Sequence, residues 1–194
     1  MADPRGLAMH GAAQRAASAP VWDVVVRGFH WTVVAGCTLN LFVLDPSSAA
    51  HRAIGYAVAA ALTVRLVWGF VGTVHARFAD FVPTPATLAR YLAALAHGRA
   101  RRHLGHNPAG AAMMLALMTL LAATALTGWM LGLNAFWGSP SLQALHGGLA
   151  NAILVLALVH VAAAVLESWR HGENLVWAMV TGRKRRDEPP YRSV

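Results

Sequence analysis

Four long apolar runs dominate the pattern of hydrophobic and polar positions along the chain. They cover residues 24–44, 54–74, 109–133 and 145–166, and polar residues, glycine and proline collect between them. A helix needs about 20 mainly apolar residues to cross the hydrocarbon core of a bilayer. The pattern therefore predicts an all-α fold, an integral membrane four-helix bundle within one domain over residues 21–182. A polar N-terminal tail (1–20), without the apolar segment of a signal peptide, and a basic C-terminal tail (183–194) flank it.

The composition supports this prediction and excludes several other classes of protein. Only 12% of the residues are charged, and mean hydropathy is +0.47, whereas a soluble domain carries roughly 25% charged residues. The single cysteine, Cys37, excludes an intrachain disulfide and a cysteine-bound metal cluster. A net charge of +8 would suggest nucleic acid in a soluble protein, but beside these apolar runs it indicates basic residues that face anionic membrane lipids.

The distribution of basic residues predicts how the chain is oriented. Four spans place both termini on the same side of the membrane. Arginine and lysine gather before the first span, between the second and third, and after the fourth, whereas residues 134–144 contain no charged residue. By the positive-inside rule, both termini and the middle connection are cytoplasmic in a bacterial inner membrane.

The middle connection, residues 75–108, is long enough to contain structure of its own. Leu88, Tyr91, Leu92 and Leu95 recur at helical spacing, which predicts a short helix on the lipid headgroups; a solvated basic loop is the alternative. The pair Asn107–Pro108 is typical of a helix start and predicts where the third span begins.

Four of the ten histidines fall within or at the ends of the spans: His30, His51, His146 and His160. Ionisable groups in a bilayer are costly and usually functional, although each histidine alone is explained by a hydrogen bond to a backbone carbonyl. His146 and His160 lie on nearly the same helix face, roughly 21 Å apart in depth. Depth then pairs His30 with His160 and His51 with His146. Two histidines at one depth on facing helices are what a six-coordinate haem iron requires.

Two further residues fit such a cofactor. Gly55 follows His51 by four residues on the same face and would let a flat macrocycle approach, although small residues also line ordinary helix contacts. Arg65 lies deep in the second span, and the spans hold no acidic residue before Glu167. A propionate of the haem held by His30 and His160 would serve as its partner; the alternative is that Arg65 reaches back to the headgroups.

The chain resembles the prokaryotic cytochrome b561 / nickel-iron-hydrogenase b-type cytochrome family. The resemblance implies two b-type haems with bis-histidine ligation, electron transfer, and often quinone as the membrane-side substrate. It covers residues 22–186 and is carried by four stretches: Phe29-His30-Trp31, His51 to Gly55 with Arg65 further on, Leu145-His146 to Asn151, and Val159-His160.

Three functions remain open at this point. The leading hypothesis is a dihaem cytochrome that carries electrons between the quinone pool and a redox partner, such as a c-type cytochrome, in a respiratory chain. A haem-bearing membrane anchor subunit of a redox enzyme such as a hydrogenase is the alternative. A proton-coupled transporter without haem would require intramembrane carboxylates, which the spans lack. Of the other histidines, His103 and His106 have the spacing of half a metal site, and His106 also fits a haem edge, a quinone site or simple interface solvation.

Overall fold

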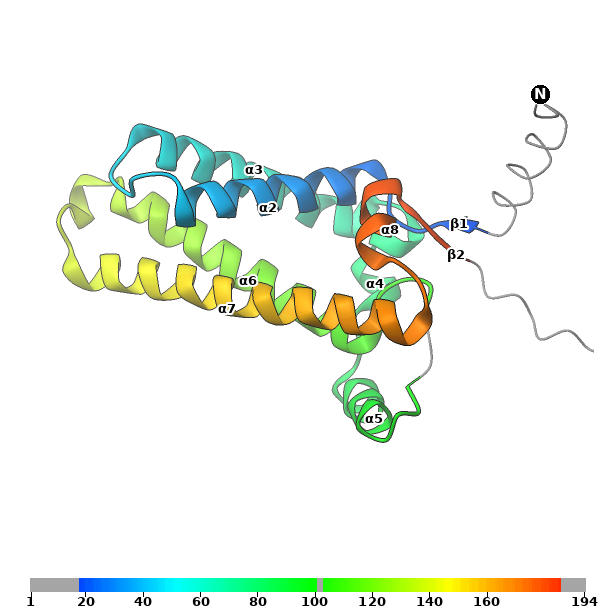
Figure 1. Ribbon diagram of the computed structural model, residues 1–194. Helices are drawn as coiled ribbons and strands as arrows, with labels where there is room; N and C mark the ends of the chain where they lie inside the picture. The colour runs from blue at the N-terminus through cyan, green and yellow to red at the C-terminus, as the bar shows by residue number, and fades with distance from the viewer. Residues whose placement is uncertain (1–17, 101–102, 186–194) are drawn as a thin grey trace, which may run out of the picture.

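Four long helices make up the body of the computed structural model, which describes residues 18–100 and 103–185. They lie side by side along one axis (Figure 1). Short connections join α2 to α3 and α6 to α7 at one end of the bundle, here called the loop end; the chain enters and leaves at the other, the terminal end. The four helices are α2 (Val24–Phe42), α3 (Ala49–Val71), α6 (Pro108–Leu131) and α7 (Pro140–His171).

The helix boundaries follow local capping rather than hydropathy. Ser48 caps α3 by accepting a hydrogen bond from the backbone N–H of His51, so α3 begins five residues before the predicted run. The helix α7 extends five residues beyond the predicted run 145–166 at each end. Ser139 caps its start, and Gly172, with a φ of 57°, ends it in the left-handed conformation that glycine adopts without strain. As predicted, Asn107 caps α6.

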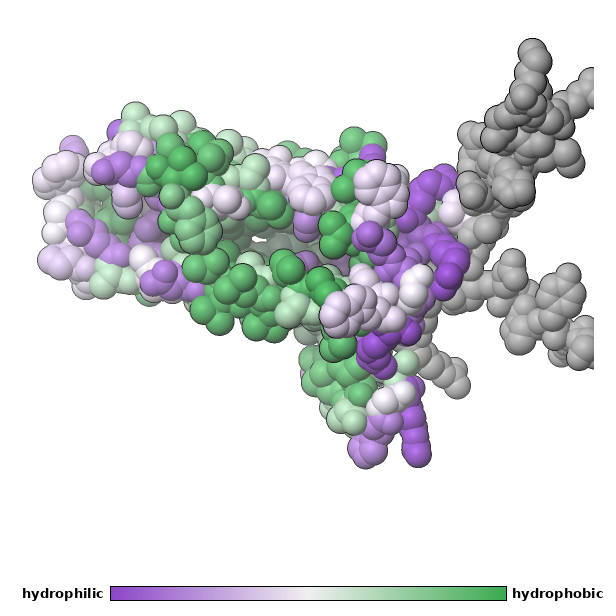
Figure 2. Space-filling model, in the orientation of Figure 1, coloured by the Kyte–Doolittle hydropathy of each residue, from purple (hydrophilic) through white to green (hydrophobic). Residues whose placement is uncertain are grey.

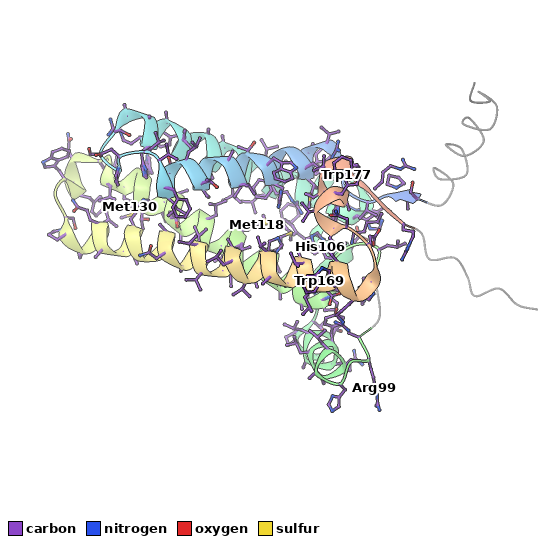
Figure 3. The ribbon with its side chains drawn as sticks, viewed as in Figure 1. Arg99, His106, Met118, Met130, Trp169 and Trp177 are labelled. Atoms are coloured by element: carbon purple, nitrogen blue, oxygen red, sulfur yellow. The ribbon has the colours of Figure 1, made fainter. Side chains whose placement is uncertain are left out.

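The helices pack in chain order: α2 against α3, α3 against α6, and α6 against α7. A small core of buried side chains joins α3, α6 and α7. Figure 3 shows Met118 of this core about midway along the bundle. By contrast, α2 and α7 share little packing, and Figure 2 shows the molecule hollowed between them. The core consists of Val58, Leu62, Met118, Leu121 and Ile153.

Much of the helix surface is apolar, as a lipid environment requires (Figure 2). Within the described residues, α3, α6 and α7 are long and apolar enough to cross a membrane, by length and composition. The predicted first span is also a helix, but α2 has only 19 residues and includes the polar side chains of Arg27, His30 and Asn40.

A small two-stranded sheet joins the two ends of the described chain, a feature absent from the all-α prediction. Strand β1 (Ser18–Pro20) pairs antiparallel with β2 (Arg183–Arg185), with Ser18 opposite Arg185. The sheet lies at the terminal end (Figure 1). It therefore ties the first and last helices together on one side of the bundle. The rest of the predicted tails, residues 1–17 and 186–194, lies outside the described residues.

The middle connection contains the predicted short helix. Helix α5 (Pro85–Ala96) starts at Thr84 and projects from the terminal end of the bundle (Figure 1). Its Tyr91 is buried, whereas Arg90 and Leu92 are exposed, so α5 packs through one face and leaves another free. Its position on lipid headgroups stays a prediction. Shorter elements complete the fold: η1 (Val74–Ala76), α4 (Phe78–Phe81), η2 (Asn134–Phe136) and α8 (Leu175–Thr181).

Candidate functional site

Two of the four histidines of interest face each other at the loop end. His51 lies in the first turn of α3, and His146 lies near the start of α7; their ring centroids are 6.3 Å apart, with the ring planes at 67°. A metal–imidazole nitrogen bond is about 2.0 Å long, and the ring centre lies about 1 Å further on, so two axial ligands of one metal ion have centroids about 6 Å apart. The observed separation suits a metal ion between the two rings.

His146 is also held from α6, by two residues that sequence reasoning missed. The hydroxyl of Thr127 lies 3.1 Å from Nδ1 of His146. A Cβ atom added to the neighbouring Gly128 would lie 3.0 Å from Cε1 of the same ring. The ring is therefore confined on one side and hydrogen-bonded at one nitrogen.

The other two histidines lie nearer the terminal end, on α2 and α7. The imidazoles of His30 and His160 are half-buried and close enough to interact electrostatically. Nδ1 of His30 and Nδ1 of His51 are both buried, without a hydrogen-bond partner in the described part of the chain. The structure thus brings His51 beside His146 and His30 within electrostatic range of His160.

Gly55, one turn after His51, leaves open space on its face of α3. A Cβ atom added to Gly55 would meet only Nδ2 of Asn40, at 3.9 Å, and one added to Gly147 or Gly148 would meet no atom within 4 Å. No side chain at Gly55 therefore blocks the approach of a flat macrocycle, and Gly147 and Gly148 lie at exposed positions beside His146. Together, the paired imidazoles and this open space fit a haem.

Arg65 is the most deeply buried charged side chain among the described residues, with 1% of its surface exposed. Nη2 donates a hydrogen bond to the carbonyl oxygen of Ala76, at 3.1 Å, and the guanidinium lies over the Phe78 ring, 5.3 Å from its centroid. Nη1 has no hydrogen-bond partner among the described residues. The side chain therefore does not reach the surface, and an unpaired buried cation of this kind requires an anion.

A carboxylate that sequence reasoning missed lies near Arg65. Asp23, one residue before the first apolar run, is close enough to interact electrostatically with the guanidinium. Its oxygens accept hydrogen bonds from Trp68 Nε1 (2.8 Å), Thr73 Oγ1 (2.6 Å) and Val26 N (2.9 Å). Burial raises the pKa of this carboxyl, but the hydrogen bonds outweigh it and hold the pKa below its ordinary value. Asp23 thus offsets the charge of Arg65 at a distance, while Nη1 remains free for a second anion.

His106 lies at the terminal end of the bundle (Figure 3). Its ring lies 4.6 Å from that of Trp22 and 4.8 Å from that of Phe81, centroid to centroid. Burial, together with the positive charges of Lys184 and Arg65, lowers the pKa of His106 to about 3. The imidazole is therefore neutral at physiological pH, and it lies within electrostatic range of His160 and Arg65.

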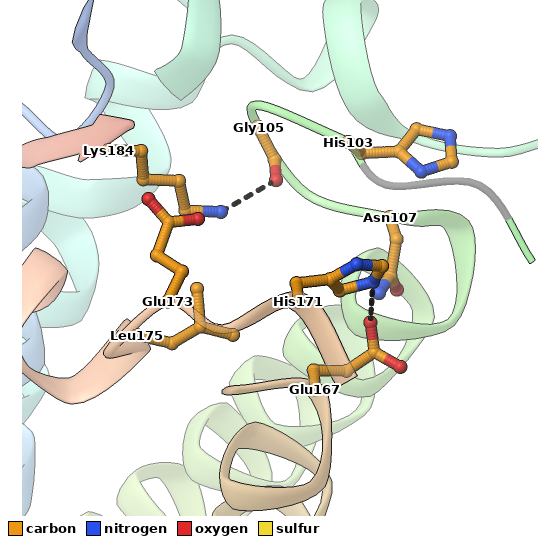
Figure 4. A pocket seen from close by; sticks show the side chains of 8 residues that line it. All are labelled: His103, Gly105, Asn107, Glu167, His171, Glu173, Leu175 and Lys184. Carbon is orange, nitrogen blue, oxygen red and sulfur yellow. Dashed lines mark hydrogen bonds and ion pairs between the residues drawn. The ribbon is translucent and has the colours of Figure 1, made fainter. Parts of the chain in front are cut away.

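A polar pocket lies beside His106 at the surface (Figure 4). Within it, Glu167 accepts a hydrogen bond from Nε2 of His171 at 3.1 Å, and Lys184 donates to the carbonyl oxygen of Gly105 at 3.3 Å. No group of three or more metal-ligating side chains occurs among the residues that the structure describes. The described residues therefore add no further ligands to the half metal site that the spacing of His103 and His106 suggests.

Paired histidines inside a bundle of apolar helices are typical of a multi-pass membrane cytochrome. The chain belongs to the prokaryotic cytochrome b561 family, whose model matches residues 21–182. It is a haem b protein that functions in electron transfer. The family expected from the sequence is confirmed.

Similar curated proteins are named as subunits of one kind of enzyme. The probable Ni/Fe-hydrogenase B-type cytochrome subunit of Rhodobacter capsulatus is 24% identical, over 88% of this chain and 83% of the relative. Its counterpart in Bradyrhizobium diazoefficiens is 25% identical, over 94% of each chain. No solved structure matches the chain.

Proposed function

We propose that this protein binds two b-type haems and carries electrons between the quinone pool and a redox partner in a respiratory chain. The observation that carries the proposal is the facing pair His51 and His146, whose separation suits two axial ligands of one iron. The pair His30 and His160 lies further along the same two helix hairpins, within electrostatic range of each other.

Each residue of the site has a distinct role in this proposal. A bound b-type haem supplies reversible one-electron transfer at its iron. His30 and His160 would hold one haem, and His51 and His146 would hold the other. Arg65, whose Nη1 has no hydrogen-bond partner among the described residues, would pair with a propionate of the first haem, and the absence of a side chain at Gly55 would leave space for the second. The apolar core of α3, α6 and α7 keeps water away.

We further propose that α2, α3, α6 and α7 all cross a bacterial inner membrane, with both termini in the cytoplasm. The pairing of β1 with β2 supports this, because it places both ends of the described chain on one side. Reporter fusions are expected to place residue 100 in the cytoplasm and residue 140 in the periplasm. A periplasmic residue 100 would contradict the orientation.

A role as the haem-bearing membrane anchor of a redox enzyme is the second candidate. It is favoured by the names of the relatives, which are hydrogenase b-type cytochrome subunits of similar length. In this version the redox partner is an enzyme subunit rather than a freely diffusing c-type cytochrome. The haem ligands and the exchange of electrons with quinone are the same in both versions.

Electron exchange with quinone is tested on the purified, haem-loaded protein in liposomes. A reduced quinol analogue is expected to produce the reduced b-type absorption bands, and the oxidised quinone is expected to reverse them. The variant His160→Ala serves as the control, because it keeps one haem and lacks the other. Bands that dithionite reduces but quinol leaves unchanged would show that quinone is not the substrate.

A further inference from the structure

Helix α6 carries none of the four paired histidines, yet one of its side chains contacts one of them. Thr127 is buried, with 6% of its surface exposed, and its hydroxyl lies 3.1 Å from Nδ1 of His146. Threonine in a membrane helix usually bonds only to its own helix backbone, as Thr119 and Thr124 do on the same helix. Thr127 does this and also reaches a neighbouring helix.

The other partners of the Thr127 hydroxyl favour the ring as the donor in this contact. A hydroxyl has one hydrogen, and the Thr127 Oγ1–H points to backbone carbonyls of α6, those of Ala123 at 2.9 Å and Thr124 at 3.0 Å. Its lone pair is then left for the ring, so Nδ1–H of His146 donates to it, while the backbone carbonyl of Thr124 lies close enough to accept from the ring as well. A neutral imidazole protonated at Nδ1 has its free lone pair at Nε2, the nitrogen available to a metal ion.

Gly128 leaves room for the same ring. A Cβ atom at this position would lie 3.0 Å from Cε1 of His146, so a larger residue would displace the ring. Thr127 therefore holds the imidazole by a hydrogen bond, and Gly128 leaves the space that the ring occupies. Nδ1 of His51, opposite, has no such partner in the described part of the chain.

We propose that Thr127 is a positioning residue for His146: it fixes the tautomer and orientation of this axial ligand and thereby sets the potential of the haem that His51 and His146 share. The inference rests on the proposed function. A hydrogen bond from the outer nitrogen of a histidine makes the ligating nitrogen more basic. Greater basicity stabilises the oxidised iron, so the bond lowers the reduction potential of this haem.

The test compares hydroxyl-lacking and hydroxyl-bearing variants in the full-length, haem-loaded protein. Thr127→Val is expected to keep both haems and to move the midpoint potential of one to a more positive value, with a changed low-spin ferric EPR signal. Thr127→Ser restores the hydroxyl and should restore both readouts. Thr124→Val is the matched control, because it removes a hydroxyl that bonds only to the carbonyl of Leu120.

Thr127→Ala also removes the hydroxyl, with a smaller side chain than valine. The test therefore remains informative if Thr127→Val does not fold. Unchanged potentials and EPR signals in a variant that holds both haems would overturn the role of Thr127. A shift in the component that His160→Ala removes, instead of the one that His146→Ala removes, would overturn it as well. Failure of the proposed function looks different: His146→Ala would then leave the haem content of the protein unchanged.

Discussion

Replacing His160 by alanine is expected to halve the haem b content of the purified protein, and His30→Ala should do the same. A bis-histidine site that loses one axial ligand loses the bond that holds the iron in a dry pocket, where no water replaces it. Pyridine haemochrome spectra, scaled to the protein concentration, measure the content. His51→Ala and His146→Ala are each expected to remove the other haem, because only ligands at one depth reach the same iron.

An exposed histidine outside the bundle gives the control for this series. His97 is the C-cap residue of α5, directly after Ala96, and its Nδ1 bonds to the carbonyl of Ala93 at 2.7 Å. His97→Ala should therefore keep the full haem content. An equal loss in this variant would mean that the histidine series reports folding rather than ligation.

Arg65→Leu is expected to retain both haems and to lower the midpoint potential of the one held by His30 and His160. Removing a buried positive charge stabilises the oxidised iron relative to the reduced iron. At an effective dielectric constant of about 20, a unit charge about 10 Å away contributes about 1.7 kcal/mol. This corresponds to a shift on the order of 70 mV for a one-electron couple. Redox titration followed in the visible spectrum measures it.

Arg65→Lys separates charge from geometry at this position. Lysine keeps the positive charge, so its shift should be smaller than that of leucine, although it cannot reproduce the guanidinium contacts with Ala76 and Phe78. If neither haem potential moves in Arg65→Leu, the propionate assignment is wrong, and Asp23 alone serves as the counter-charge.

The elements that the sequence predicts well are those with local signals. Apolar runs of membrane length and the cap at Asn107 locate the long helices, and helical spacing locates α5. The ends of α7 were missed because they carry polar residues such as Gln143 and Glu167, which interrupt the hydropathy but not the helix. The strands β1 and β2 were missed because each has only three residues and its partner lies at the opposite end of the described chain, so no local signal marks either strand.

The residues of the candidate site likewise divide into those that stand out in the sequence and those that only the structure reveals. Histidine and buried arginine are rare in apolar segments, so His30, His160 and Arg65 stand out in the sequence. Threonine and glycine are common in membrane helices, so nothing in the sequence distinguishes Thr127 and Gly128 from other packing residues. Their roles depend on which face of α6 meets α7, and this is settled only by packing.

The haem content of double variants tests the central claim, two haems each held by its own pair of histidines, most directly. The double variant of His30→Ala with His160→Ala is expected to retain one haem b per chain, as each single variant does, because both substitutions empty the same site. The cross-pair variant of His30→Ala with His146→Ala should retain none. If the first double variant loses all of its haem while the second keeps one per chain, the pairing proposed here is contradicted.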